Sequence, residues 1–437
     1  MLNRDVRIPS GPTEAYKPAE DLLQWLGRNF DTFGDIYKAS IYGTAAYVIR
    51  DPEIVYHVLV ENWQNYEKGL MIQRVAMLLG HGLMVSEGEV WKRQRRTIQP
   101  TFNHGNVDTL VGLMATVNAE LSKKWQEAAQ KNEPVNVTRD VSGMALEVVL
   151  RFLFGIDYER IRTDFDLISH EPARNVAFAR SFRALGKVIL GMVERRREGS
   201  SPSADALSLL VQARDPRTGD TIGDSQLVDE IFTLIIAGHE TTASTLNWTW
   251  YLLSQHPEIE ARMVAEIDQQ TFCGVEDLPK FPYTRRVLDE AMRLYPAGWL
   301  LTRKALADDW LGDYFLPAGT EVYVPPYFIH RNPNLWVNPE QFAPERFEEE
   351  NVKSRHRLAA IPFSSGPRNC IGALFARTEM QIHLILVAKC LRLRFTPPRP
   401  IELDPGVNLR SKYDFEMFPE IRGSFQPSRA TTTGETR

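Results

Sequence analysis

The stretch Phe363-Ser-Ser-Gly-Pro-Arg-Asn-Cys370-Ile-Gly372 decides the expected fold. It leads into residues 371–391, whose apolar positions follow helical spacing, so Cys370 is expected where a loop enters a helix. Free backbone N–H groups and the positive end of the helix converge there, and both favour a thiolate. The glycines would let the backbone lie flat against a large planar ligand. Considered alone, a single cysteine is more often a small buried apolar residue.

The pattern Phe-x-x-Gly-x-Arg-x-Cys-x-Gly resembles the haem-binding signature of the cytochrome P450 family. Every defining position matches, and the matched residues are Phe363, Gly366, Arg368, Cys370 and Gly372. The resemblance covers about Pro9 to Pro419 and implies that these residues bind haem b, with Cys370 as the axial ligand of its iron. It implies a mainly α fold with minor β-sheets, a triangular single large domain. The haem would lie buried between a long central helix and the cysteine-loop helix.

Composition indicates a soluble globular protein, with 437 residues, 43% hydrophobic and 24% charged, and a net charge of -5. So mild a charge gives no general reason to expect a nucleic-acid partner. The three cysteines, Cys273, Cys370 and Cys390, lack the spacing of disulfide frameworks or zinc sites, so a cytoplasmic location is expected. No stretch reaches the roughly 18 apolar residues of a membrane span, and the polar N-terminus is unlike a signal peptide.

Coarse patterning predicts one domain over residues 1–423 and a disordered tail over 424–437. Residues 35–50 are predicted to form an antiparallel strand pair, and 321–325 a further strand. Most of the chain between the strand pair and about Tyr295 is predicted to be helical.

A long helix is expected from Asp224 or Ser225 to about His256, where a His-Pro step ends it. Its apolar face changes to small and hydroxylated residues at Gly238, Thr241, Thr242 and Thr245. Threonines at such positions can simply bond back to the preceding turn and kink the helix. The stretch Ala237-Gly-His-Glu-Thr-Thr242, however, resembles the oxygen-activating motif of the family. That resemblance implies that Gly238 and Thr242 lie beside the haem, and that Gly238 leaves room for dioxygen. It also implies that Glu240 and Thr241 deliver protons to the bound oxygen.

Glu290 and Arg293 lie three residues apart near the end of a helix before Tyr295. Alone, such a pair is an ordinary surface ion pair. The family carries the same motif upstream of its cysteine loop, where it joins an arginine from an irregular segment. The resemblance therefore implies a structural triad of Glu290, Arg293 and Arg346, which acts as scaffold and takes no part in catalysis.

Trp91 and Arg95 are one turn apart and share a helix face. The resemblance implies that Trp91 lies over the haem edge and that Arg95, Arg303 and Arg368 contact the haem propionates. The neighbouring run of Lys92, Arg93 and Arg96 can offer a basic patch to an acidic electron donor. A nucleic-acid signal is the rival interpretation of such a run.

An apolar pocket is predicted to include Ala297, Trp299 and Leu300, with further contacts from residues 71–85 and from the region of Ile235 and His239. Ordinary core packing is an equal alternative for the first three. Such a pocket suits a lipophilic substrate such as a terpenoid, fatty acid, steroid or polyketide. No dinucleotide fingerprint follows the cysteine helix, so the resemblance implies a monomer that receives electrons from a ferredoxin or flavodoxin with an NAD(P)H reductase.

The family has two long helices as a lid where this chain offers about forty residues, near 155–197. One lid helix can be formed by 176–196. Either the lid is shortened or residues have been omitted, and omission is the preferred hypothesis.

Overall the sequence indicates a monooxygenase that inserts one oxygen atom of O₂ into a C–H bond. The alternatives are a haem enzyme that uses peroxide directly, which Glu240 and Thr241 argue against, and a haem-binding sensor or electron carrier without turnover.

Overall fold

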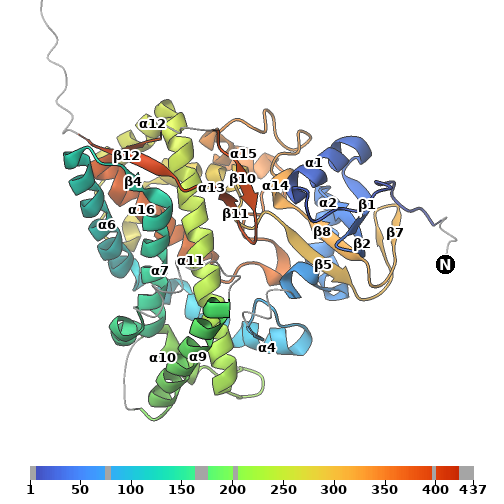
Figure 1. The fold of residues 1–437 in the computed structure, drawn as a ribbon, viewed down its shortest axis with the longest axis horizontal. Coiled ribbons are helices and arrows are strands. Elements are labelled where there is room, and N and C mark those ends of the chain that lie inside the picture. Colours follow the sequence, from blue (N-terminus) through green and yellow to red (C-terminus); the bar gives the residue numbers. More distant parts are fainter. Residues whose placement is uncertain (1–5, 74–79, 163–175, 200–204, 396–399, 423–437) are drawn as a thin grey trace, which may run out of the picture.

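The structure, a computed structural model, describes residues 6–73, 80–162, 176–199, 205–395 and 400–422. Figure 1 shows a helix-rich part beside a smaller sheet-rich part, with helix α11 running along most of the helical part. The expected mainly α fold with minor β-sheets is confirmed. The tail predicted over 424–437 lies outside the described residues.

Most of the helices gather in the helix-rich part of the molecule, whereas α1 lies with the main sheet (Figure 1). Their bounds are Gly88–Ile98 for α4, Val111–Lys131 for α6, Val137–Phe154 for α7, Val176–Arg197 for α9, Ala206–Gln212 for α10, Asp224–Gln255 for α11, Pro257–Gln269 for α12, Pro282–Leu294 for α13 and Ala373–Cys390 for α16. The remaining α-helices are Leu22–Phe33 (α1), Pro52–Tyr56 (α2), His104–Asp108 (α5), Pro326–Ile329 (α14) and Glu349–Ser354 (α15).

The main sheet has the strand order β1-β2-β8-β5-β3. Its strands are Ile36–Ile41 (β1), Thr44–Ile49 (β2), Tyr66–Lys68 (β3), Leu301–Ala305 (β5) and Glu321–Val324 (β8). The smaller sheets use Val135–Asn136 (β4), Asp309–Leu311 (β6), Tyr314–Leu316 (β7), Leu391–Arg394 (β9), Leu403–Pro405 (β10), Leu409–Ser411 (β11) and Glu416–Ile421 (β12). The antiparallel pair predicted over 35–50 is confirmed as β1 and β2, and the strand predicted over 321–325 as β8.

Two apolar clusters cover the two faces of the main sheet. Val48 and Tyr323 pack into a cluster with α1, whereas Tyr47 and Val322 pack into the cluster on the other side. This alternation is expected because successive side chains of a strand point to opposite faces. A third, larger cluster joins the helices. The sheet is thus buried on both sides.

Helix α11 is the central element of the helical part. It ends at Gln255, and Pro257 follows two residues later, as the predicted His-Pro stop requires. It packs along α7 and also contacts α9, α13 and α16. The predicted lid helix is present as α9, although residues 163–175 before it lie outside the described part. None of the described helices combines the length and apolarity that crossing a membrane requires.

Candidate active site

Cys370 lies in a tight loop three residues before α16 begins. Its backbone N–H donates to the carbonyl oxygen of Phe363 at 2.9 Å, which closes the loop. Gly366 has a φ of +72°, and a Cβ there would overlap the carbonyl oxygen of Leu59. This glycine is therefore required by its backbone conformation and by close packing against residues 57–61. A Cβ on Gly372, by contrast, would meet nothing within 4 Å, so open space adjoins the backbone beside the cysteine.

The Cys370 thiol is accessible to solvent, and yet the surrounding protein desolvates it. Burial raises the pKa of the thiol, and a backbone hydrogen bond with Gly372 and the charge of Arg95 oppose the rise without cancelling it. Desolvation thus opposes the thiolate that the backbone N–H groups and the helix end were expected to favour, and that expectation stays a prediction. A bound metal ion would supply the missing stabilisation of the thiolate.

The middle of α11 carries the predicted oxygen site. Thr241 Oγ1 donates to the carbonyl oxygen of Ala237 at 2.6 Å, so the back-bonding alternative is present as well. Ala237 is exposed and Thr241 partly so, which marks the accessible face of the helix. A Cβ on Gly238 would instead lie 3.0 Å from the Val149 side chain of α7. Gly238 therefore allows close packing of α11 against α7. Ala237, rather than Gly238, lies on the accessible face where room for dioxygen was expected.

Thr242 is 1% exposed, and its hydroxyl has no hydrogen-bond partner among the described residues. It is therefore a buried residue beside the accessible face. A direct part for Thr242 in cofactor binding stays a prediction.

Glu240 and His239 are held by other elements. The amide of Asn408, just before β11, donates to Glu240 Oε2 at 3.2 Å. His239 Nε2 lies 2.7 Å from Ser142 Oγ of α7, and burial lowers the pKa of this histidine. His239 thus packs against α7, which does not support the predicted substrate contact there. Asn408 was not found from the sequence, because it is distant in the chain and belongs to no motif.

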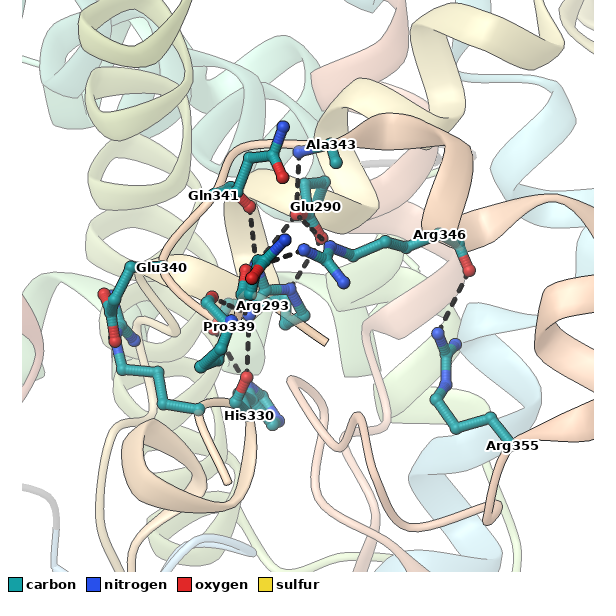
Figure 2. Close-up of polar contacts among 11 residues, drawn as sticks. Glu290, Arg293, His330, Pro339, Glu340, Gln341, Ala343, Arg346 and Arg355 are labelled. Atoms are coloured by element: carbon teal, nitrogen blue, oxygen red, sulfur yellow. Dashed lines mark hydrogen bonds and ion pairs between the residues drawn. The ribbon is translucent and has the colours of Figure 1, made fainter. Parts of the chain in front are cut away.

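The predicted scaffold is assembled, with Glu290 and Arg293 fully buried and Arg346 partly buried (Figure 2). Arg293 donates to the two carboxylate oxygens of Glu290 at 2.6 and 2.8 Å, and neither side chain is exposed. Arg346 Nε lies 3.3 Å from Glu290 Oε1. Arg293 also donates to the carbonyl oxygens of His330 and Pro339, both at 2.7 Å. The surface alternative for this pair is wrong, because residues 330–343 fold over it.

A group of buried cations lies between the main sheet and the cysteine loop. Arg303 is 7% exposed, has no ion pair among the described residues, and has its pKa lowered to about 10 by burial and then by Arg368. Arg368 pairs with both oxygens of Glu87 at 2.7 and 2.5 Å. Lys68 is 8% exposed, and burial lowers its pKa to about 7. Glu87 and Lys68 are further site residues that no sequence motif indicated.

Trp91 and Arg95 share α4 but have different neighbours. The Arg368 guanidinium lies 5.1 Å from the Trp91 ring centre, so Trp91 adjoins the cation group. Arg95 donates to the carbonyl and side-chain oxygens of Asn369, at 2.6 and 2.8 Å, immediately before Cys370. The structure therefore brings Arg303 and Arg368 together and sets Arg95 apart, on the cysteine side. That arrangement does not support propionate contact by Arg95.

The predicted pocket residues are mostly core residues. Trp299 is 2% exposed, packs in the cluster with α1, and donates to the carbonyl oxygen of Gly406 at 3.0 Å. Ala297 is 8% exposed, and Leu300 is partly buried against the same cluster. The core-packing alternative therefore holds for Trp299, because its ring and its N–H are both used within the protein.

Comparisons with known proteins show the family to which the chain belongs. The family model described as Cytochrome P450 matches residues 15–170 and 165–415. The chain is 32% identical over 402 residues to cyclooctat-9-en-7-ol 5-monooxygenase of Streptomyces melanosporofaciens, with 86% of each chain covered. It is 31% identical to cyclooctatin synthase of the same organism, covering 92% and 91%. The crystal structure of the cytochrome P450DA haem domain has a TM-score of 0.85 at 24% identity, covering 95% and 97%.

The fold and the cysteine site thus define a haem-thiolate enzyme. The chain belongs to the cytochrome P450 family and is a monooxygenase that oxidises lipophilic molecules. Its residues fit the haem that the family implies. Cys370 is exposed in its loop, Gly372 borders open space, and Arg303, which has no ion pair among the described residues, suits a carboxylate.

Proposed function

We propose that this enzyme hydroxylates a terpenoid with one oxygen atom of O₂, using haem b and electrons from a ferredoxin or flavodoxin with its NAD(P)H reductase. The terpenoid class is supported by the relatives, whose names refer to cyclooctatenol and cyclooctatin. The Cys370 loop carries the proposal, since it offers a thiolate ligand beside open space. The predictions of a monomer, of a cytoplasmic location, of the 1–423 domain and of no nucleic-acid partner are unchanged.

Haem ligated by a thiolate supplies O–O cleavage, because the thiolate pushes electron density toward the iron. The protein has two further tasks. Arg303 and Arg368 would hold the propionates by charge-assisted hydrogen bonds, and Lys68 would add positive charge to the group. Arg368 would share its donors between Glu87 and a propionate.

On the distal side, the residues of α11 hold and move protons. Thr241 Oγ1 donates to the Ala237 carbonyl oxygen and can turn its proton toward the open face of the helix. Glu240 accepts a proton from solvent at its carboxylate, which Asn408 orients. Positioned groups of this kind are what general acid catalysis requires.

The electron donor is proposed to dock near α4. Arg93 is exposed and has no ion pair among the described residues, whereas Lys92 pairs with Glu89 and Arg96 pairs with Asp215. Arg95 lies between this surface and Asn369, next to the cysteine. An acidic donor would therefore meet a smaller positive patch than the sequence run suggested.

The test is turnover under isotopically labelled dioxygen. The purified protein is reconstituted with ferredoxin, reductase and NADPH, and given a panel of cyclic terpene alcohols, fatty acids and steroids. We expect a terpenoid to shift the haem spin state and to gain one labelled oxygen atom. Product that forms only with peroxide would favour the peroxide-using alternative. A spin-state shift without product from any compound would favour the sensor alternative.

A further inference from the structure

Residues 80–87, which we call the α4 entry segment, lead into α4 and lie against the first half of α11. The His81 N–H donates to Asp229 Oδ2 at 2.9 Å. A Cβ on Gly82 would overlap the hydroxyl of Thr233, so the backbone there touches α11 directly. These contacts are one and two turns before Ala237. The α4 entry segment therefore borders the same helix that carries the oxygen site.

Leu83 within this segment is held from both sides by buried ionisable groups. Its N–H donates to Glu230 Oε2 at 2.7 Å, and its carbonyl oxygen accepts from Lys68 Nζ at 2.8 Å. Lys68 also donates to the carbonyl oxygen of Ser86 at 2.9 Å. Glu230 is 0% exposed and Lys68 is 8% exposed. A carboxyl from α11 and an amine from β3 are thus joined through one residue.

Burial of two such groups is unfavourable unless each is well paired. Burial raises the pKa of Glu230 to about 7 and lowers that of Lys68 to about 7, and each charge opposes the shift of the other. Two neutral amides also support the segment, because Gln94 and Gln226 both donate to the His81 carbonyl oxygen. The segment is therefore fixed by side chains rather than by a strand or helix.

The same contacts reach the cysteine loop. The Lys68 N–H donates to Glu87 Oε1 at 2.6 Å, and Glu87 pairs with Arg368. Met84 and Val85, which follow Leu83, are only partly buried. The α4 entry segment thus lies between α11 and the loop that carries Cys370, with two apolar side chains partly accessible.

We propose that Glu230 and Lys68 are positioning residues that clamp Leu83 and so hold Met84 and Val85 as a fixed wall for the lipophilic substrate. The inference rests on the proposed function for the nature of the substrate. The clamp itself is independent of turnover. It predicts that the two side chains affect substrate binding together, and that neither affects the haem ligand.

The experiment compares E230Q, K68M and the double variant with the wild-type holoenzyme. Hydrogen–deuterium exchange reports the order of residues 80–87, with α16 as an internal reference. K68M loses a hydrogen bond to a buried backbone group, and E230Q replaces a charged acceptor by a neutral one, so each single variant is expected to speed exchange in 80–87 severalfold or more. KM should rise by a similar factor with little change in kcat, while the carbonyl complex of the reduced haem keeps its absorption band. E120Q, an exposed change on α6, is the matched control.

A joint clamp makes the two changes non-additive, so the double variant should lose little more than either single one. Additive losses, or unchanged exchange in both single variants, would overturn the proposal. If the variants fail to fold, the wild-type protein still decides, because a Leu83 amide that exchanges as fast as an exposed one excludes the clamp. If exchange changes in the variants as expected but the wild-type enzyme forms no product from any compound, the proposed function is contradicted and the clamp is still supported.

Discussion

Arg293 and Glu290 form a two-point ion pair with no exposed surface on either side chain. The remaining donors of Arg293 go to carbonyl oxygens of the segment over 330–341, including His330 and Gln341 (Figure 2). The Ala343 N–H donates to Glu290 Oε1 at 2.9 Å. The pair therefore acts as the folding template for an irregular segment that has little secondary structure of its own.

Breaking this pair should be severe. Arg293→Leu leaves the Glu290 carboxylate buried without its main partner, and loss of one member of a buried pair costs roughly 3–5 kcal/mol. Urea unfolding and the fraction of protein that retains haem are the measurements. Glu349→Gln removes one member of an exposed pair with Lys353 and should change neither. A stable Arg293→Leu protein with normal haem content would contradict the template role.

The cluster around Asp309 should make stability depend on pH. Asp309 Oδ2 accepts from Tyr66 at 2.6 Å and from Asn62 at 2.9 Å, and lies 2.9 Å from His57 Nε2. The pKa of Asp309 is lowered, since these bonds outweigh burial, and that of His57 is raised, since Glu61 and Asp309 outweigh its burial.

The two shifts act at opposite ends of the pH range. A raised histidine pKa gives stability that is complete below about pH 6.5 and is lost as pH rises through the folded value. A lowered aspartate pKa gives stability that is complete above about pH 4 and is lost as pH falls through the folded value. Melting temperatures of wild type and His57→Gln should therefore differ most near pH 5–6 and converge in alkali. A pH-independent difference would exclude the linkage, and His104→Gln, at an exposed site, is the control.

Thr241→Ala should uncouple NADPH consumption from product. The change removes the hydroxyl on the accessible face of α11, so oxygen is reduced with less controlled proton delivery. We expect the product formed per NADPH to fall by roughly tenfold or more. Thr249→Val is the matched control, because Thr249 bonds back to the Thr245 carbonyl oxygen in the same way but is 0% exposed. Unchanged coupling in Thr241→Ala would count against the assignment.

Asn408→Ala should produce a milder form of the same defect. The amide orients the Glu240 carboxylate, and its loss leaves the acid free to turn away from the proton path. Product per NADPH is expected to fall severalfold, by loss of about 1 kcal/mol of hydrogen bonding, with unchanged substrate affinity. Asn351→Ala removes an exposed amide on α15 and serves as control. Weaker substrate binding with normal coupling would show that Asn408 shapes the pocket instead.

The features that the sequence predicted well are those specified locally. Cys370 and α11 follow from a loop that enters a helix and from long apolar periodicity, and both are where they were expected. Burial of the Glu290–Arg293 pair could not be predicted from spacing, because the segment that covers it comes some forty residues later. Likewise β3 is too short to recognise alone, since Tyr66 pairs with Ala305 across the chain.

The remaining site residues were not predicted for the same physical reason. Lys68, Glu87, Glu230 and Asn408 act through contacts between distant elements, and a lone polar residue has no sequence pattern that marks such contacts. Gly238 shows the reverse error. Its motif was recognised, but the direction of the missing Cβ depends on how α11 and α7 pack.

The thiolate ligation of haem by Cys370 is the central claim, and the absorption spectrum of the reduced carbonyl complex tests it most directly. Wild type, Cys273→Ser and Cys390→Ser should all give the red-shifted band that a thiolate ligand produces, because neither of the other cysteines lies in the loop. Cys370→Ser should lose that band while its fold, followed by circular dichroism, is retained. A red-shifted band that persists in Cys370→Ser, or its loss in either of the other two variants, would contradict the account.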